Sequence, residues 1–165
     1  MAWLVAELTA HKAKAERKGF EFSVRINGTS DLSFEKYEVV RNGVLYRNIF
    51  EAFSDIQFYD YTKILGRKVN DIKNYSLTFS AADGNDYDVA KAIIQGYNIA
   101  MVFGIKKTEP MPAEYMTLPV FNGDESDLRF LDPKGVIVGL YAKGKAKKDT
   151  SGFVKYPTIM LKVAA

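Results

Sequence analysis

Hydrophobic and polar residues recur along the chain in patterns that predict alternating helices and strands. Residues 2–18 place Trp3, Leu4 and Leu8 on one side of an expected helix, and Gly19 follows it as a natural stop. Residues 20–27 alternate strictly between apolar and polar side chains, which predicts a strand. Residues 34–54 are expected to be rich in helix, with Asn42-Gly43 as an internal break.

The remaining apolar segments continue the same alternation. They predict strands at residues 56–63, 75–81, 98–105 and 135–143, and a short helix at 87–97. The proline-bearing residues 106–120 are interpreted as a connector, and residues 126–132 as a helical turn that Pro133 stops.

This order of elements predicts an α/β fold, because alternating strands and helices favour parallel pairing with crossover helices. The first and third strands should each have one apolar face against helices and one polar face towards water. We therefore expect a partial (βα) barrel or a curved, mostly parallel sheet of about five strands with crossover helices. A two-layer sandwich with one exposed sheet face is the alternative. A single domain over residues 1–154 is expected, with 155–165 as a C-terminal extension and candidate added strand.

Composition limits the chemistry available to the chain. It has no cysteine, which excludes thiolate nucleophiles and cysteine-bound zinc or iron–sulfur clusters, and its one histidine, His11, excludes a histidine-rich metal site. A carboxylate-held magnesium or calcium ion stays possible, and no cofactor is indicated. The N-terminus does not resemble a secretion signal and no apolar run has the length of a membrane span, so we expect a cytoplasmic protein without membrane contact.

Polar residues at the predicted strand ends are candidates for ligand binding, since ligands of parallel α/β folds bind at the carboxyl ends of the strands. The candidates for an anionic ligand such as a nucleotide or phosphate are Arg25, Asn27, Thr62, Lys63, Thr78 and Ser80. Asp60 and Asp31 are the candidate acid/base residues. Asp60 lies in the middle of a buried strand, so it needs a partner or a function. The alternative is that Arg25 forms a structural ion pair with Asp60 or Asp31.

Charge concentrates again after residue 120. Asp124 and Asp127 are weak candidates for a magnesium ion, although Asp124 or Ser126 capping the following helical turn explains these residues more simply. Four lysines, Lys143, Lys145, Lys147 and Lys148, are candidates for contacts with the phosphates of a nucleic acid. A solvated terminal extension is the alternative, and the net charge of only +3 slightly favours it.

Several segments together resemble a known family. RINGTSD (25–31), QFYDYTK (57–63), YSLTFS (75–80), NIAMVF (98–103) and above all residues 118–154 are similar to the C-terminal portion of phage proteins named for mycobacteriophage gene product eighty-eight. The resemblance covers residues 1–154. The resemblance implies a phage origin. It also implies longer relatives that resemble barrels of the radical-SAM type and carry an upstream cysteine-containing segment. This chain lacks that segment. The resemblance implies no reaction and no catalytic residues.

Three functions follow as hypotheses. The first is a phage protein that binds an anionic ligand, either a nucleotide, a phosphate or a nucleic acid, without chemistry of its own. The second is a protein–protein interaction or inhibitor module for a host factor, or a homo-oligomer formed through open sheet edges. The third is an enzyme that uses Asp60 or Asp31 as acid/base. The sequence leaves open whether there is a reaction.

Overall fold

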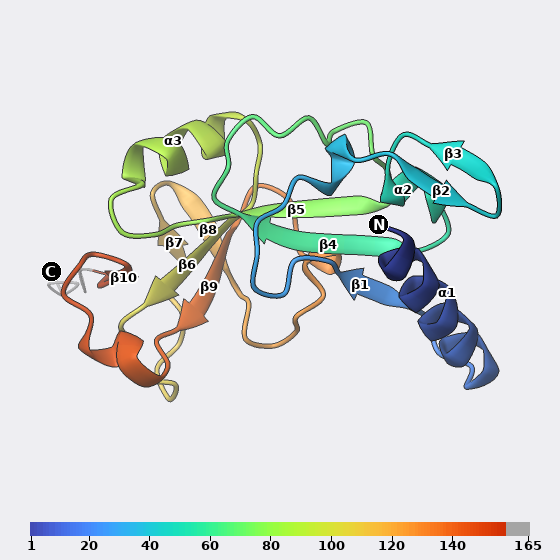
Figure 1. Cartoon of the computed structure of the whole chain (residues 1–165). Coiled ribbons are helices and arrows are strands. Elements are labelled where there is room, and N and C mark those ends of the chain that lie inside the picture. The colour runs from blue at the N-terminus through green and yellow to red at the C-terminus, as the bar shows by residue number, and fades with distance from the viewer. Residues whose placement is uncertain (158–165) are drawn as a thin grey trace, which may run out of the picture. The chain divides into compact units, whose positions relative to one another are not determined.

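The computed structural model describes residues 1–157 (Figure 1). The chain divides into two compact units, Met1–Leu77 and Thr78–Ala165, and each is described by itself. This division does not test the expectation of a single domain over 1–154, which stays a prediction. Most of the proposed C-terminal extension, residues 158–165, lies outside the described part of the chain.

The first unit begins with helix α1 (Ala2–Arg17) and a short strand β1 (Ser23–Arg25). β1 pairs in parallel with β4 (Gln57–Thr62), so that Arg25 lies opposite Tyr59. β5 (Tyr75–Ser80) is the next strand in the order, and the N–H of Phe58 donates to the carbonyl of Asn74 just before it. The helix and the three strands are where the sequence pattern predicts them, although β1 covers only the centre of 20–27.

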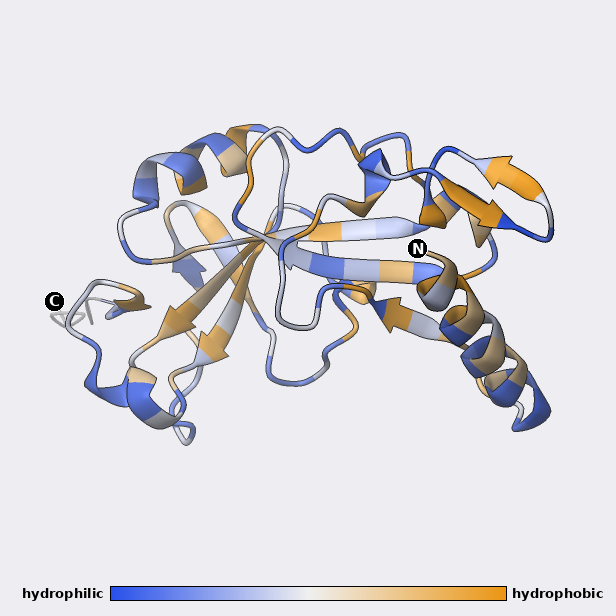
Figure 2. Cartoon of the chain, viewed as in Figure 1, coloured by the Kyte–Doolittle hydropathy of each residue, from blue (hydrophilic) through white to orange (hydrophobic). Residues whose placement is uncertain are grey.

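Residues 34–54 do not form the predicted helix-rich segment. They form a single 3-10 turn, η1 (Phe34–Lys36), an antiparallel hairpin of β2 (Val39–Arg41) and β3 (Val44–Tyr46), and a one-turn helix, α2 (Ile49–Ala52). The hairpin follows from its turn: Asn42 and Gly43 have φ of 52° and 78°, the left-handed values that a two-residue hairpin loop requires. Figure 2 shows both strands as mostly hydrophobic, and Val40, Val44 and Leu45 are exposed.

A cluster of apolar side chains forms the core of the first unit. Its buried members are Leu8, Val39, Ile49, Phe50, Ala52, Phe53, Ile56, Phe58, Val69 and Tyr75. The ring of Phe50 stacks on Tyr75 at a centroid distance of 4.1 Å. Aromatic pairs of this kind contribute about 0.5–1.5 kcal/mol beyond the apolar area they bury. Helix α2 therefore contributes mainly through its buried side chains, since a single turn has little stability of its own.

The second unit is built around strand β6 (Ile99–Phe103), whose residues are almost all buried. β6 pairs in parallel with the end of β5 and along its whole length with β9 (Ile137–Tyr141). β8 (Leu118–Asn122) adds in parallel to β9, and β7 (Glu114–Tyr115) forms a hairpin with β8. β10 (Val154–Lys155) pairs in parallel with the last residues of β6.

The prediction of an α/β fold with a mostly parallel sheet is confirmed. Helix α3 (Asp86–Ile94) lies between β5 and β6 as a crossover helix, whereas the connector expected at 106–120 contains β7 and the start of β8. The helical turn expected at 126–132 is a 3-10 turn, η2 (Arg129–Leu131). Within neither unit do the described strands close into a barrel.

Candidate functional site

A basic pocket lies where strands β6 and β9 end in the second unit. The cavity measures ≈ 400 Å³, and the residues that line it are Gly104, Ile105, Lys106, Lys107, Tyr141, Ala142, Lys143, Gly144, Lys147 and Tyr156. The in-register pairing of Phe103 with Tyr141 produces this pocket, because the segments that follow two parallel strands leave the sheet at the same edge. The residue after Tyr141 continues the contact, since the N–H of Ala142 donates to the carbonyl of Phe103.

Four lysines line this pocket, and no acidic side chain is among the described residues that do so. Lys106 and Lys107 follow β6, while Lys143 and Lys147 belong to the start and the body of a 3-10 turn, η3 (Gly144–Lys148). Within residues 1–157 only Lys143 of the four has an ion pair, at 2.5 Å from Asp124. The Asp124 carboxylate raises the pKa of Lys143, so this ammonium stays charged.

Asp124 supports the wall of the pocket and does not occupy it. Its second oxygen accepts the backbone N–H of Tyr141 at 2.8 Å, where β9 ends. Partial burial opposes ionisation, but the bonds from Lys143 and Tyr141 outweigh it and lower the pKa of Asp124. Ser126, the other predicted cap, accepts the N–H of Leu128. Within residues 1–157 no group of three or more His, Cys, Asp or Glu side chains is placed to hold a metal, Asp124 and Asp127 included.

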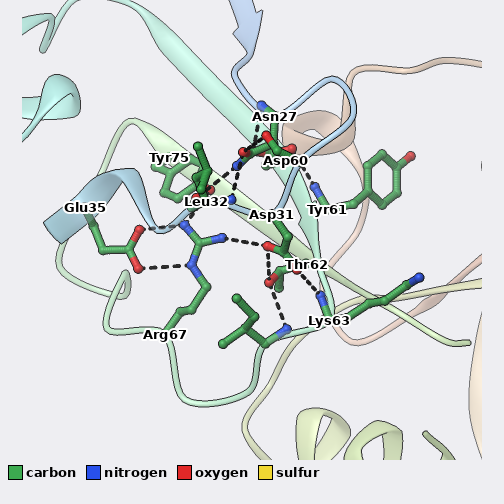
Figure 3. Close-up of polar contacts among 12 residues, drawn as sticks. Asn27, Asp31, Leu32, Glu35, Asp60, Tyr61, Thr62, Lys63, Arg67 and Tyr75 are labelled. Atoms are coloured by element: carbon green, nitrogen blue, oxygen red, sulfur yellow. Dashed lines mark hydrogen bonds and ion pairs between the residues drawn. The ribbon is translucent and has the colours of Figure 1, made fainter. Parts of the chain in front are cut away.

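A second polar cluster lies in the first unit, at the ends of β1 and β4 (Figure 3). The Asp60 side chain is fully buried, and its Oδ2 accepts the backbone N–H of Asn27 at 3.0 Å and the side-chain amide of the same residue at 2.5 Å. Its Oδ1 accepts the N–H of Tyr61 and lies 3.9 Å from Nε of Arg25. Burial raises the pKa of Asp60 to about 6, although these donors favour the ionised form.

The other half of this cluster surrounds Arg67. Its guanidinium donates to both oxygens of Glu35, at 3.0 and 2.6 Å, and to Oδ1 of Asp31 at 3.4 Å. It also donates to the hydroxyl of Tyr75 at 3.1 Å. Asp31 in turn accepts the hydroxyl of Thr62 and the backbone N–H of Lys63 (Figure 3). Every carboxylate of the cluster is thus engaged by donors from this chain, as in a structural network.

The candidate ligand-binding residues of the sequence fall into two groups. Asn27 and Thr62 are buried inside the cluster, Arg25 lies over the ring of Tyr61 at 4.7 Å with its side chain 44% exposed, and Lys63 contributes its backbone N–H. Thr78 and Ser80 belong to the second unit, where Thr78 is buried and the carbonyl of Ser80 accepts the side-chain amide of Asn85. The alternative pairing of Arg25 with Asp60 is present as a long contact.

The model of the gene product 88 family matches residues 1–157. The chain belongs to this phage family. Comparison with curated proteins and with solved structures finds no match. The family is named for a gene product and not for an activity, so membership assigns no function to the residues of this chain. None of the helices within residues 1–157 is long and apolar enough to span a membrane.

Sequence reasoning missed several residues of both sites in this gene product 88 protein. Glu35 and Arg67 were not singled out, because their separation along the chain conceals the pairing. No sequence pattern singles out Lys106 and Lys107. The cluster of lysines at 143–148 does not distinguish Lys143 and Lys147, which line the pocket, from Lys145 and Lys148, which do not. Tyr156 was missed because its place depends on β10 pairing with β6.

Proposed function

We propose that this phage protein binds an anionic ligand in the basic pocket at the ends of β6 and β9. The observation that carries the proposal is the convergence of Lys106, Lys107, Lys143 and Lys147 on one cavity of ≈ 400 Å³. Such a volume lies in the range of small-molecule sites. Like charges held together repel one another, and an anion that binds among them relieves that repulsion. The proposed site lies at strand ends, where the sequence predicts a ligand site. It uses lysines that follow β6 and β9 in place of the six candidates Arg25, Asn27, Thr62, Lys63, Thr78 and Ser80.

The ligand is phosphate-like in its recognition. Lysine is a common phosphate-binding residue that acts as a point charge, and three of the four ammonium groups have no ion pair within residues 1–157. The alternative site at the ends of β1 and β4 has less support, because the donors of Asn27 and Arg67 are already used by carboxylates of the chain. Action in the cytoplasm of the infected host remains part of the proposal.

Isothermal titration calorimetry with inorganic pyrophosphate tests this proposal. The variant Lys106→Ala/Lys147→Ala removes two exposed lysines that line the pocket, and Lys145→Ala/Lys148→Ala removes two from the same region that do not. The net charge changes equally in both, so a general electrostatic effect would weaken binding equally. We expect the pocket variant to lose about tenfold or more in affinity and the control to lose about twofold or less. Equal losses in the two variants would refute the proposal, and so would a wild type that binds neither pyrophosphate nor the nucleotide and oligonucleotide tested below.

The enzyme hypothesis has one observation in its favour. The pKa of about 6 for Asp60 is suitable for an acid/base residue near neutral pH. However, Asp60 is fully buried, and both oxygens accept N–H groups of the chain. Asp31 likewise accepts from Thr62, Lys63 and Arg67. We therefore favour a structural role for both carboxylates and binding without chemistry for the protein.

The interaction hypothesis is supported by the edge position of β1 in the first unit. β4 is its only neighbour among the described strands, so one side of β1 is open to pairing with a host protein or a second copy. A cavity of ≈ 430 Å³ beside it is lined by residues of α1 and by residues 22–26, which include β1, and Trp3 among them is 73% exposed. Light scattering measures the molar mass of wild type and of Trp3→Ala and so tests whether the protein forms a homo-oligomer. A monomeric mass for both proteins would refute this form of the hypothesis.

A further inference from the structure

Tyr156 provides an aromatic surface at the basic pocket. A Cβ atom added to Gly104 would overlap the Tyr156 ring, so the ring packs directly against the backbone where β6 ends. The N–H of Gly104 donates to the carbonyl of Lys155 at 2.9 Å, which holds the residue before Tyr156 in place. Nevertheless Tyr156 is 60% exposed. One part of the ring is therefore supported by the chain and the rest is open to a ligand.

Tyr141, the other aromatic residue that lines the pocket, is also held by hydrogen bonds. The hydroxyl of Tyr141 donates to the carbonyl of Glu109 at 2.8 Å, and its backbone N–H donates to Asp124. Four lysines line the same cavity as these two aromatic residues, together with Gly104 and Gly144, which have no side chains to fill it. The pocket thus combines a supported aromatic ring, cationic groups and space for a planar group.

We propose that the basic pocket binds a nucleotide, with the base stacked on Tyr156 and the phosphates held by the lysines. This inference rests on the proposed function and names the class of anion. A simple phosphate would use the lysines and leave the aromatic ring without a role. Stacking suits any base, because every base has a π-face, and the pairing of aromatic rings with cationic groups is typical of nucleotide-chain binding.

The nucleotide has two sources, a free nucleotide or one unit of a single-stranded nucleic acid. Lys145 and Lys148 separate them, because these residues lie on η3 but do not line the pocket. A single strand extends beyond the pocket, and its further phosphates would reach such lysines. A free nucleotide would not. Lys145→Ala/Lys148→Ala should therefore weaken the binding of an oligonucleotide and spare that of a mononucleotide.

The test compares inorganic pyrophosphate with ADP, which adds a nucleoside to the same phosphates. We expect wild type to bind ADP more tightly than pyrophosphate in calorimetry. Tyr156→Ala and Tyr156→Leu should weaken ADP binding by about 5- to 100-fold and leave pyrophosphate binding within about twofold, since stacking on an aromatic ring is lost. Tyr156→Phe keeps the ring and should restore the affinity for ADP. A short oligothymidylate, titrated into wild type and Lys145→Ala/Lys148→Ala, distinguishes the two sources.

The outcomes separate this inference from the proposed function. One outcome overturns the nucleotide assignment and leaves anion binding in place. In it, pyrophosphate binds, ADP and the oligonucleotide bind no more tightly than pyrophosphate, and the Tyr156 variants do not change any of these affinities. If none of the three ligands binds, both proposals fall. A loss of ADP or oligonucleotide affinity in Tyr156→Leu with recovery in Tyr156→Phe supports the assignment. An equal loss for pyrophosphate in Tyr156→Leu would overturn it, because the ring would then only support the pocket.

Discussion

Replacing Arg67 by methionine is the sharpest test of the polar cluster in the first unit. The Arg67 side chain is 1% exposed and the side chain of Glu35 is 5% exposed, so their ion pair is out of water. Burial favours loss of the guanidinium charge, but the hydrogen bonds that Arg67 donates to Glu35 outweigh it and raise the pKa of Arg67. Burial likewise opposes ionisation of Glu35, and the bond from Arg67 outweighs it and lowers the Glu35 pKa. Each charge therefore depends on the other.

The expected cost follows from what the substitution leaves behind. Methionine keeps the apolar stem of the side chain but has no hydrogen-bond donor. The Glu35 carboxylate therefore stays buried without its two hydrogen bonds from Arg67, and Asp31 also loses its hydrogen bond from Arg67. Removing one partner of a buried ion pair costs about 3–5 kcal/mol in the free energy of unfolding. This is a large fraction of the about 5–15 kcal/mol that stabilises a typical domain.

Urea denaturation followed by far-UV circular dichroism measures this cost at neutral pH. The matched control is Arg47→Met, since the Arg47 side chain is 86% exposed and pairs with Glu51 on the surface. We expect the control to cost less than about 1 kcal/mol. The double variant Arg67→Met/Glu35→Gln should recover part of the loss, because glutamine removes the stranded charge. The reasoning is refuted if Arg67→Met costs no more than Arg47→Met, or if Glu35→Gln adds its full single-variant cost to Arg67→Met.

Two further predictions concern the same unit. Burial raises the pKa of Asp60 from 3.8 to about 6, so the folded state holds that proton more tightly than the unfolded state. The contribution of Asp60 to the free energy of unfolding should therefore fall by about 3 kcal/mol in all as pH rises through these two pKa values, and level off above about pH 7. Asp60→Asn should flatten this part of a pH series of urea denaturations, and an unchanged slope would contradict the assigned pKa. Gly43→Ala should lower the free energy of unfolding by about 1–2 kcal/mol, because Gly43 has a φ of 78°, which alanine rarely adopts. The added Cβ itself would meet no atom within 4 Å. Gly28→Ala is equally unobstructed and lacks a positive φ, so it should be nearly neutral in the same assay.

The strands that the sequence predicts correctly are those with a clear local pattern of apolar residues. β4, β5, β6 and β9 are apolar enough to be recognised locally, and helix α3 lies between two of them. Alternation with helices predicts parallel pairing, but of these strands only β5 and β6 are joined by an α-helix, α3. The order of strands and the position of β8 could not be predicted, because they depend on contacts between distant segments.

The errors have local physical causes. Asn42-Gly43 was interpreted as a break in a helix-rich segment, whereas this dipeptide between apolar residues is the strongest short signal for a hairpin. Prolines at 110, 112 and 119 favoured a plain connector over residues 106–120. Pro119 is nevertheless compatible with β8, because β7 opposite it is only two residues long and lies at the end of the strand order.

The two polar sites differ in what the chain supplies to them, and this difference is the reason why we propose ligand binding in the second unit. In the first unit, Asp60, Glu35 and Asp31 are all met by donors of the chain, so a ligand would have to displace bonds already made. In the second unit, the register of β6 with β9 brings lysines from two segments to one cavity and supplies an ion pair to Lys143 alone among those lysines within residues 1–157. Buried polar networks whose groups are all hydrogen-bonded stabilise a fold, whereas converging like charges that are only partly paired attract ions of the opposite charge. Substituting Lys106 and Lys147, which have no ion pair within residues 1–157, should therefore affect affinity and leave the free energy of unfolding nearly unchanged.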